Sequence, residues 1–227
     1  MHQTKSIVLA CFFMAFTFSN SVVAANTASE YRQLGLLYRK QGRNQEAIAA
    51  MRKSVELEPQ NPTGKINLGW TLHLSGQRQE AAQYLWQAVS QQPFKDSAYN
   101  ALGIVYLVDG NLTAAVAIHT WAIILKPQNE VAYYNLSLAL HRLKIFNLAI
   151  ATANYAASLE PNNPHPLVAS AIVYWDSGNH NLAVNAYKKA IYLDNRYRNN
   201  SFLAHLQQAA FCQEQINTVK QILINSK

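Results

Sequence analysis

The sequence predicts an all-α protein in which helix–turn–helix units stack into a right-handed solenoid. Three observations lead to this prediction. Five alanines recur every 34 residues without insertion or deletion. A small residue lies twelve positions before each alanine, and a proline lies twelve positions after four of the five. A fixed period of this length is typical of repeated units that bury their core by stacking on their neighbours. The alanines are Ala47, Ala81, Ala115, Ala149 and Ala183.

The recurring residues have a common physical reason, which is close helix packing. Small side chains let the two helices of a unit approach each other, and a second small series follows each alanine by seven positions. Proline cannot continue a helix, so it ends the second helix of each unit. The two small series are Gly35, Gly69, Gly103, Ser137 and Ala171, then Ser54, Ala88, Ala122, Ala156 and Ala190. The prolines are Pro59, Pro93, Pro127 and Pro161, with Asn195 in the fifth place.

Five repeats follow in order. Their bounds are 28–61, 62–95, 96–129, 130–163 and 164–197. In the first repeat Tyr31, Leu34, Gly35 and Tyr38 form the i, i+3, i+4, i+7 stripe of an amphipathic helix. An asparagine followed by proline at 61–62 and at 163–164 is a helix-start signal, because the amide caps the first turn. Glycine is expected in the turns, but Lys144 takes its place in the fourth repeat, so that turn must bend in another way.

The C-terminal stretch, 198–227, loses the small-residue positions and predicts a degenerate pair of capping helices over 200–212 and 214–224. A terminal repeat has one neighbour only, so its outer face should be polar. The segment's five glutamines fit such a cap. They are Gln207, Gln208, Gln213, Gln215 and Gln221.

The N-terminal stretch, 1–25, is expected to be a secretory signal peptide. Lys5 precedes a mostly apolar stretch over 6–19, and the small residues Val23, Ala24 and Ala25 end it. The protein is therefore expected to be exported; an uncleaved N-terminal membrane anchor is the less favoured alternative. Removal of the signal also removes Cys11, which leaves Cys212 without a partner for an internal disulfide.

Composition excludes several function classes. Charged residues make up 14% of the chain, and the net charge of +7 is spread without a long basic run, so nucleic-acid binding is not expected. Metal-ligand spacings, phosphate loops and nucleophile motifs are missing from the sequence. His73 and His141 fall two repeats apart, too far to share one metal ion. The sequence thus predicts a non-enzymatic protein without cofactor.

Residues 28–197 closely resemble the tetratricopeptide-repeat family in period and in the small-residue and proline positions. The resemblance implies that the first helices of the repeats line a concave groove and that the partner is a protein or peptide. More weakly, the segment that begins at Asp194 and runs to Ile216 resembles the end of some cyanobacterial members of the family. Export otherwise implies the periplasm; in a cyanobacterial protein the compartment would be the thylakoid lumen.

The predicted groove has an apolar floor with aromatic and imidazole groups and a basic edge. The alternative is that neighbouring helices hide much of this surface. The family's carboxylate clamp is not expected, because Arg32 and Leu36 occupy the positions that need Lys and Asn. The predicted floor residues are Leu36, Ile66, Trp70, His73, Ile104, Leu107, Tyr134, Leu138, His141, Ile172 and Trp175. The predicted edge residues are Arg32, Arg39, Lys40 and Arg142.

These residues predict an adaptor or scaffold that binds a partner segment and serves in the assembly or maintenance of an envelope or membrane complex. The alternative is a carbohydrate or small-ligand module that uses Trp70 and Trp175 as stacking platforms. A second aromatic set falls on the outer side of the second helices, where it is either partly buried between repeats or forms a partner- or membrane-facing surface. It comprises Trp86, Trp121, Tyr155 and Tyr192.

Overall fold

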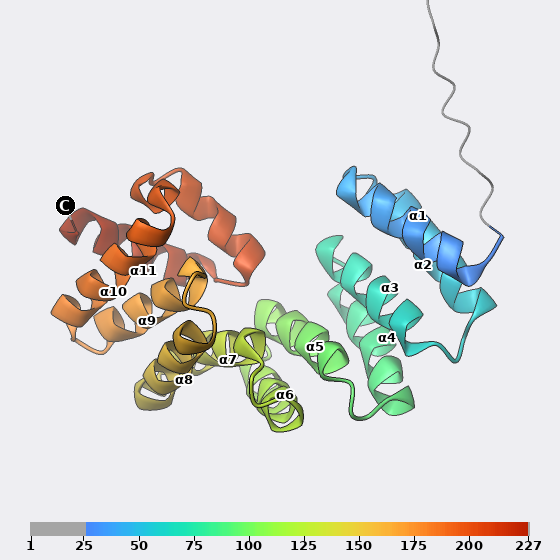
Figure 1. Ribbon diagram of the computed structural model, residues 1–227, viewed down its shortest axis with the longest axis horizontal. Coiled ribbons are helices and arrows are strands. Elements are labelled where there is room, and N and C mark those ends of the chain that lie inside the picture. Colours follow the sequence, from blue (N-terminus) through green and yellow to red (C-terminus); the bar gives the residue numbers. More distant parts are fainter. Residues whose placement is uncertain (1–25, 227) are drawn as a thin grey trace, which may run out of the picture.

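The computed structural model describes residues 26–226, and this part of the chain is all-helical, as predicted. Five antiparallel helix pairs follow one another along a curved stack (Figure 1). The predicted signal peptide lies outside the described residues. The pairs are α1 (Ala28–Lys40) with α2 (Asn44–Leu57), α3 (Pro62–Leu74) with α4 (Arg78–Gln91), α5 (Asp96–Asp109) with α6 (Leu112–Leu125), α7 (Glu130–Arg142) with α8 (Phe146–Leu159), and α9 (Pro164–Asp176) with α10 (His180–Leu193).

Small residues bring the helices of each pair into close contact. All five recurring alanines are fully buried. A Cβ placed on Gly69 would lie 2.7 Å from the Leu85 Cγ atom, and one on Gly103 would lie 2.5 Å from the His119 ring. Both distances are shorter than side chains tolerate, so these positions require glycine because of packing.

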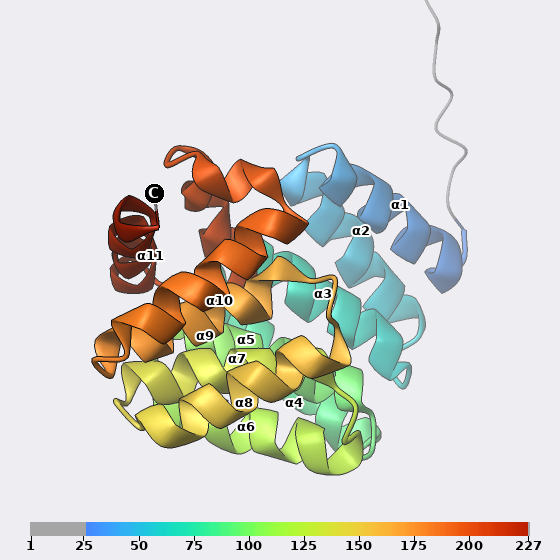
Figure 2. The same ribbon diagram turned by 60° about the vertical axis from the view of Figure 1, so that its left-hand side comes forward.

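The curvature of the stack separates an inner from an outer side. Besides its own partner, each first helix contacts the first helix of the next pair, from α1–α3 through α7–α9. The first helices therefore line the inner, concave side, and α4, α6 and α8 lie along the outside (Figures 1 and 2).

Helix starts and turns follow local chemistry. The Asn61 and Asn163 side chains accept hydrogen bonds from the amides of Thr63 and His165, at 3.0 Å each. Glycine takes the left-handed conformation in the turns of four repeats, while in the fourth repeat Lys144 itself takes it, with φ at 61°. The backbone of that turn is thus unchanged, at a cost of roughly 1–2 kcal/mol for a residue with a Cβ.

The C-terminal segment closes the stack. It consists of two 3₁₀ helices, η1 (Asn195–Arg198) and η2 (Phe202–Ala209), followed by the helix α11 (Gln213–Asn225). The first of the two predicted capping helices is therefore a 3₁₀ helix, shorter than expected. Ala210 follows it with φ at 65°, and this sharp bend returns α11 onto α9 and α10. The fully or almost fully buried Leu203, Leu206 and Ile216 join the segment to the core of repeats four and five.

No helix among residues 26–226 is both long enough and apolar enough to span a membrane.

Candidate partner-binding groove

The C-terminal segment lies against the concave side of repeats four and five. The Gln215 Nε2 group donates to the Leu138 carbonyl at 3.2 Å and to His141 Nδ1 at 3.1 Å. The Tyr134 hydroxyl donates to the Ala209 carbonyl. Residues 207–216 thus occupy the part of the groove that α7 and α9 would otherwise offer to a partner.

This placement corrects part of the predicted floor. Leu107, Leu138 and Ile172 are fully buried, and His141 is only 8% exposed. The three aliphatic residues belong to one apolar core together with side chains of the C-terminal segment. They stabilise the fold and are not available to a partner.

His141 has a structural role as well. Its Nδ1 accepts from Gln215, so the proton resides on Nε2, which donates to Asp176 Oδ2 at 2.8 Å. With both nitrogens engaged, the imidazole cannot act as a base toward another group. The Cys212 thiol near this cluster is free and half-buried, and burial raises its pKa. The arrangement orients α11 and offers no activated nucleophile.

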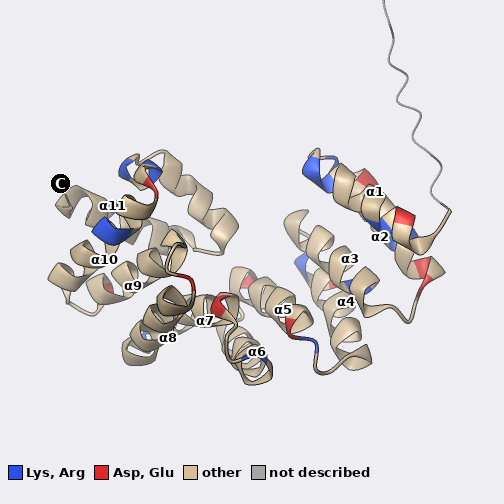
Figure 3. Cartoon of the chain, viewed as in Figure 1, with Lys and Arg blue, Asp and Glu red and all other residues tan. Residues whose placement is uncertain are grey.

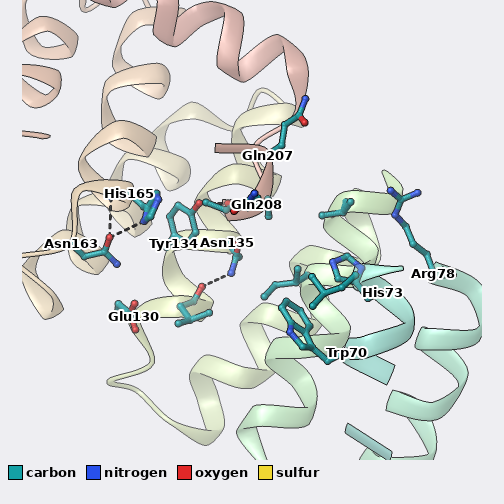
Figure 4. Close-up of a pocket in the computed structure, with 16 residues that line it drawn as sticks. Trp70, His73, Arg78, Glu130, Tyr134, Asn135, Asn163, His165, Gln207 and Gln208 are labelled. Atoms are coloured by element: carbon teal, nitrogen blue, oxygen red, sulfur yellow. Dashed lines mark hydrogen bonds between the residues drawn. The ribbon is translucent and has the colours of Figure 1, made fainter. Parts of the chain in front are cut away.

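Most of the predicted floor residues in repeats one to three stay accessible, with the exception of the buried Leu107. Leu36 is 38% exposed, and Ile66, Trp70, His73 and Ile104 are half-buried. We call these five residues the open groove. At its inner end lies a pocket of about 330 Å³ (Figure 4). Its walls come from α3, α5, α7, the start of α9 and the end of η2, and include Trp70, His73, Ile104, Tyr134, His165 and Ala209.

The pocket lining combines uncharged hydrogen-bonding groups with two ionisable residues, Arg78 and Glu130. Asn135, a pocket residue, is 2% exposed; its Nδ2 donates to the Val131 carbonyl at 2.9 Å, and its Oδ1 has no partner. His73 Nδ1 and His165 Nε2 also have none. Burial lowers the pKa of both histidines, which keeps them neutral at pH 7. The pKa of Glu130 in the same wall is raised, mainly by burial and to a smaller extent by the negative charge of the nearby Glu160.

Half of the predicted basic edge is engaged within the fold. Arg32 donates to Glu58 at 2.8 Å, and Arg142 donates to the Leu107 carbonyl at 2.6 Å. Arg39 is half-buried, with burial lowering its pKa, whereas Lys40 is exposed. The acidic and basic residues are drawn in Figure 3. Two of the four predicted edge residues therefore remain without a strong internal partner.

Several pocket residues were not predicted from the sequence. Gln207 to Ala210 belong to the C-terminal segment, Arg78 begins a second helix, and His165 opens α9. The repeat register could not predict residues 207–210, because their place in the pocket depends on how the C-terminal segment folds back. Trp175, a predicted floor residue, lies outside the pocket lining and packs edge-on against His180 with centroids 4.3 Å apart.

Within residues 26–226, no three His, Cys, Asp or Glu side chains are grouped so that they could hold a metal ion.

Comparisons with known proteins agree with this architecture. Models of the tetratricopeptide repeat match residues 28–61, 75–130 and 166–197, together more than half of the chain. A crystal structure of MamA is 25% identical with a TM-score of 0.63, and the match covers 72% of this chain and 95% of MamA. MamA from Desulfovibrio magneticus RS-1 is 20% identical (TM-score 0.66, 75% and 97% covered). The thermophilic repeat protein TTC0263 of Thermus thermophilus is 21% identical (TM-score 0.66, 81% and 98% covered).

No curated protein matches the chain by sequence. The matched segments cover helices of repeats one, two, three and five, and these helices pack in consecutive antiparallel pairs. The chain belongs to the tetratricopeptide-repeat proteins, a class of protein-interaction scaffolds that are generally not enzymes.

Proposed function

We propose that this protein is an exported adaptor that holds a segment of a partner protein in its open groove, as part of an envelope or membrane complex. One observation carries the proposal. The concave side of α7 and α9 already holds a segment of the chain itself, residues 207–216, whereas the same side of α1, α3 and α5 keeps apolar residues at the surface. A concave face that receives one peptide segment in its second half is suited to receive another in its first half.

The chemistry of the open groove indicates the kind of segment. Burial of a side chain such as Ile66 or Trp70 against a partner contributes roughly 1.5–3 kcal/mol, part of which offsets the cost of association. The 330 Å³ pocket accommodates one large apolar side chain of the guest. Around it, Asn135 and the neutral His73 and His165 provide hydrogen-bonding groups for the guest's uncharged backbone.

Peptide selection followed by calorimetry tests the proposal. Peptides are selected on immobilised protein comprising residues 26–227, and their Kd is measured by isothermal titration. Ile66→Ala combined with Trp70→Ala should weaken binding at least tenfold and leave the helical circular dichroism unchanged. Trp175→Ala is the matched control, because this tryptophan also lies on a first helix but outside the pocket lining; it should change Kd less than threefold. Unchanged binding by the double variant, or equal loss in the control, would refute the assignment.

The carbohydrate alternative loses one of its two platforms, because Trp175 packs against His180 and does not line the pocket with Trp70. Titration of the same protein with a glucose or N-acetylglucosamine oligosaccharide separates the two functions. Saccharide binding that Trp70→Ala abolishes, together with failure to select any peptide, would replace the adaptor proposal.

A further inference from the structure

The outer face of repeats three and four has a surface that the groove does not use. The helices α6 and α8, residues 112–125 and 146–159, contain no charged side chain, although charged residues make up 14% of the chain (Figure 3). Large apolar side chains on these helices face solvent. Trp121 and Tyr155 are 44% and 43% exposed, and Ile124 and Leu148 are 61% and 58% exposed. We call these four residues the outer apolar patch.

The helix pairing does not require an aromatic residue at the positions of Trp121 and Tyr155, although the Tyr155 ring packs edge-on against Tyr133 with centroids 4.6 Å apart. Because the repeats keep an unbroken period, α4 and α10 show which residues suffice at the same register. Where α6 and α8 have Trp121 and Tyr155, α4 has Gln87 and α10 has Lys189, both exposed. All four helices pack on their partners through the same buried alanines. An exposed apolar surface typically marks an interaction site.

Shape and charge favour a lipid surface as the occupant. The helices α6 and α8, which carry the patch, lie on the outer, convex side of the stack (Figures 1 and 2). Two rigid convex faces touch over a narrow strip and would not bury the roughly 800 Å² per partner of a stable protein interface. The head-group region of a bilayer, in contrast, deforms around a ridge, and tryptophan and tyrosine are the side chains enriched at that depth.

Basic residues lie on the elements that precede and follow α8 in the stack. Lys144 lies two residues before α8, and Lys188 and Lys189 lie on α10; all three are exposed, and the ion pairs within residues 26–226 do not include them. The whole chain carries a net charge of +7. Anionic head groups would be attracted to these lysines; α6 and α8 themselves contain no carboxylate, and the exposed Glu160 directly follows α8.

We propose that the outer apolar patch docks this protein on an anionic bilayer surface, with Trp121, Ile124, Leu148 and Tyr155 at head-group depth. In this orientation the concave groove faces away from the membrane and stays accessible to a partner. The proposal does not depend on the identity or existence of that partner.

Vesicle sedimentation with residues 26–227 tests the proposal. The probes are vesicles of phosphatidylcholine alone and of phosphatidylcholine mixed two to one with the anionic phosphatidylglycerol. The protein should bind the anionic vesicles, and binding should weaken with added salt. Trp121→Gln combined with Tyr155→Lys places at these sites the residue types of α4 and α10, so the fold should persist. This double variant should bind at least tenfold more weakly.

Two controls separate this inference from other causes. Phe94→Gln removes an aromatic side chain that is 82% exposed in the α4–α5 loop, outside the patch, and should not change vesicle binding. Ile66→Ala with Trp70→Ala, which tests the open groove, should also sediment like the parent. If the double variant loses its helical circular dichroism, the single Trp121→Gln variant takes its place.

Three outcomes would overturn the proposal. The first is a parent protein that sediments with neither vesicle, and the second is a patch variant that binds as tightly as the parent. The third is a parent that light scattering shows to be a dimer and that the patch variants dissociate, in which case the outer apolar patch is an interface between two copies. As an independent readout, a variant that retains Trp121 as its only tryptophan should show fluorescence quenching by brominated lipid.

Discussion

Replacing His119 with leucine should stabilise the protein, most of all at mildly acidic pH. The His119 ring is fully buried between α5 and α6, and neither of its nitrogens makes a hydrogen bond of good geometry, although the nearby Gly103 backbone offsets a minor part of the effect of burial on its pKa. Leucine is already present at the equivalent position of repeat two, where Leu85 packs against Gly69 as His119 packs against Gly103. His119→Leu therefore removes an unsatisfied polar group and introduces a side chain that the equivalent site of repeat two already accommodates.

Two effects set the magnitude. A buried polar group without a partner costs about 1–3 kcal/mol, which is the expected gain in the free energy of unfolding at pH 7.5. Burial also lowers the pKa of His119 to about 3, against 6.5 for an ordinary histidine. The unfolded chain therefore binds a proton that the folded chain does not, so stability falls as the pH drops below 6.5. At about 1.4 kcal/mol per pH unit, this loss reaches roughly 2 kcal/mol at pH 5.

The assay is urea unfolding followed by circular dichroism at pH 7.5 and pH 5.0. The stability difference between His119→Leu and the parent should be positive at pH 7.5 and larger by roughly 2 kcal/mol at pH 5.0. His73 and His165, whose pKa values burial also lowers, titrate in both proteins and cancel in this difference. His180→Gln, at an exposed site, is the control for loss of an imidazole. A variant less stable than the parent, or a difference independent of pH, would refute the reasoning.

Three further predictions concern backbone strain, packing and processing. Lys144→Gly should raise the free energy of unfolding by roughly 0.5–1 kcal/mol, because glycine removes the strain of the left-handed turn but adds freedom to the unfolded chain; a lower melting temperature would contradict this. Ala115→Leu overpacks a fully buried central contact and should cost roughly 1–3 kcal/mol or more, whereas Ile224→Ala, at a 68% exposed terminal site, should shift the melting temperature less; the reverse order would count against the stacked-repeat model. Mass spectrometry of the exported protein should find Asn26 as the first residue, or Ala25 if cleavage falls one residue earlier, and retention of Met1 would support an uncleaved anchor instead.

Where a contact lies within a repeat or between neighbouring repeats, the sequence was a sufficient guide. The all-helical solenoid follows from alanines and small residues at fixed offsets, because close packing at those positions recurs in every unit. Even the exception at Lys144 keeps the common turn, since the backbone conformation is imposed by the two helices that it joins.

The candidate site was predictable only in its first half. Leu36, Trp70 and Ile104 lie on the accessible concave side, as their register implies. Leu138 and Ile172 have the same register but are fully buried. Nothing in their own repeats distinguishes them; the difference arises from a segment beyond the last repeat.

The sequence by itself thus determined the fold and its period, because these properties depend on interactions between near neighbours in the chain, while the inward position of the first helices was implied by the family resemblance. The tertiary structure decided how much of the groove is open. Gln215 reaches the Leu138 carbonyl and Tyr134 reaches Ala209 across separations of 77 and 75 residues. Such contacts depend on the bend after η2 and on the apolar surface that α11 buries, and neither recurs at the repeat period.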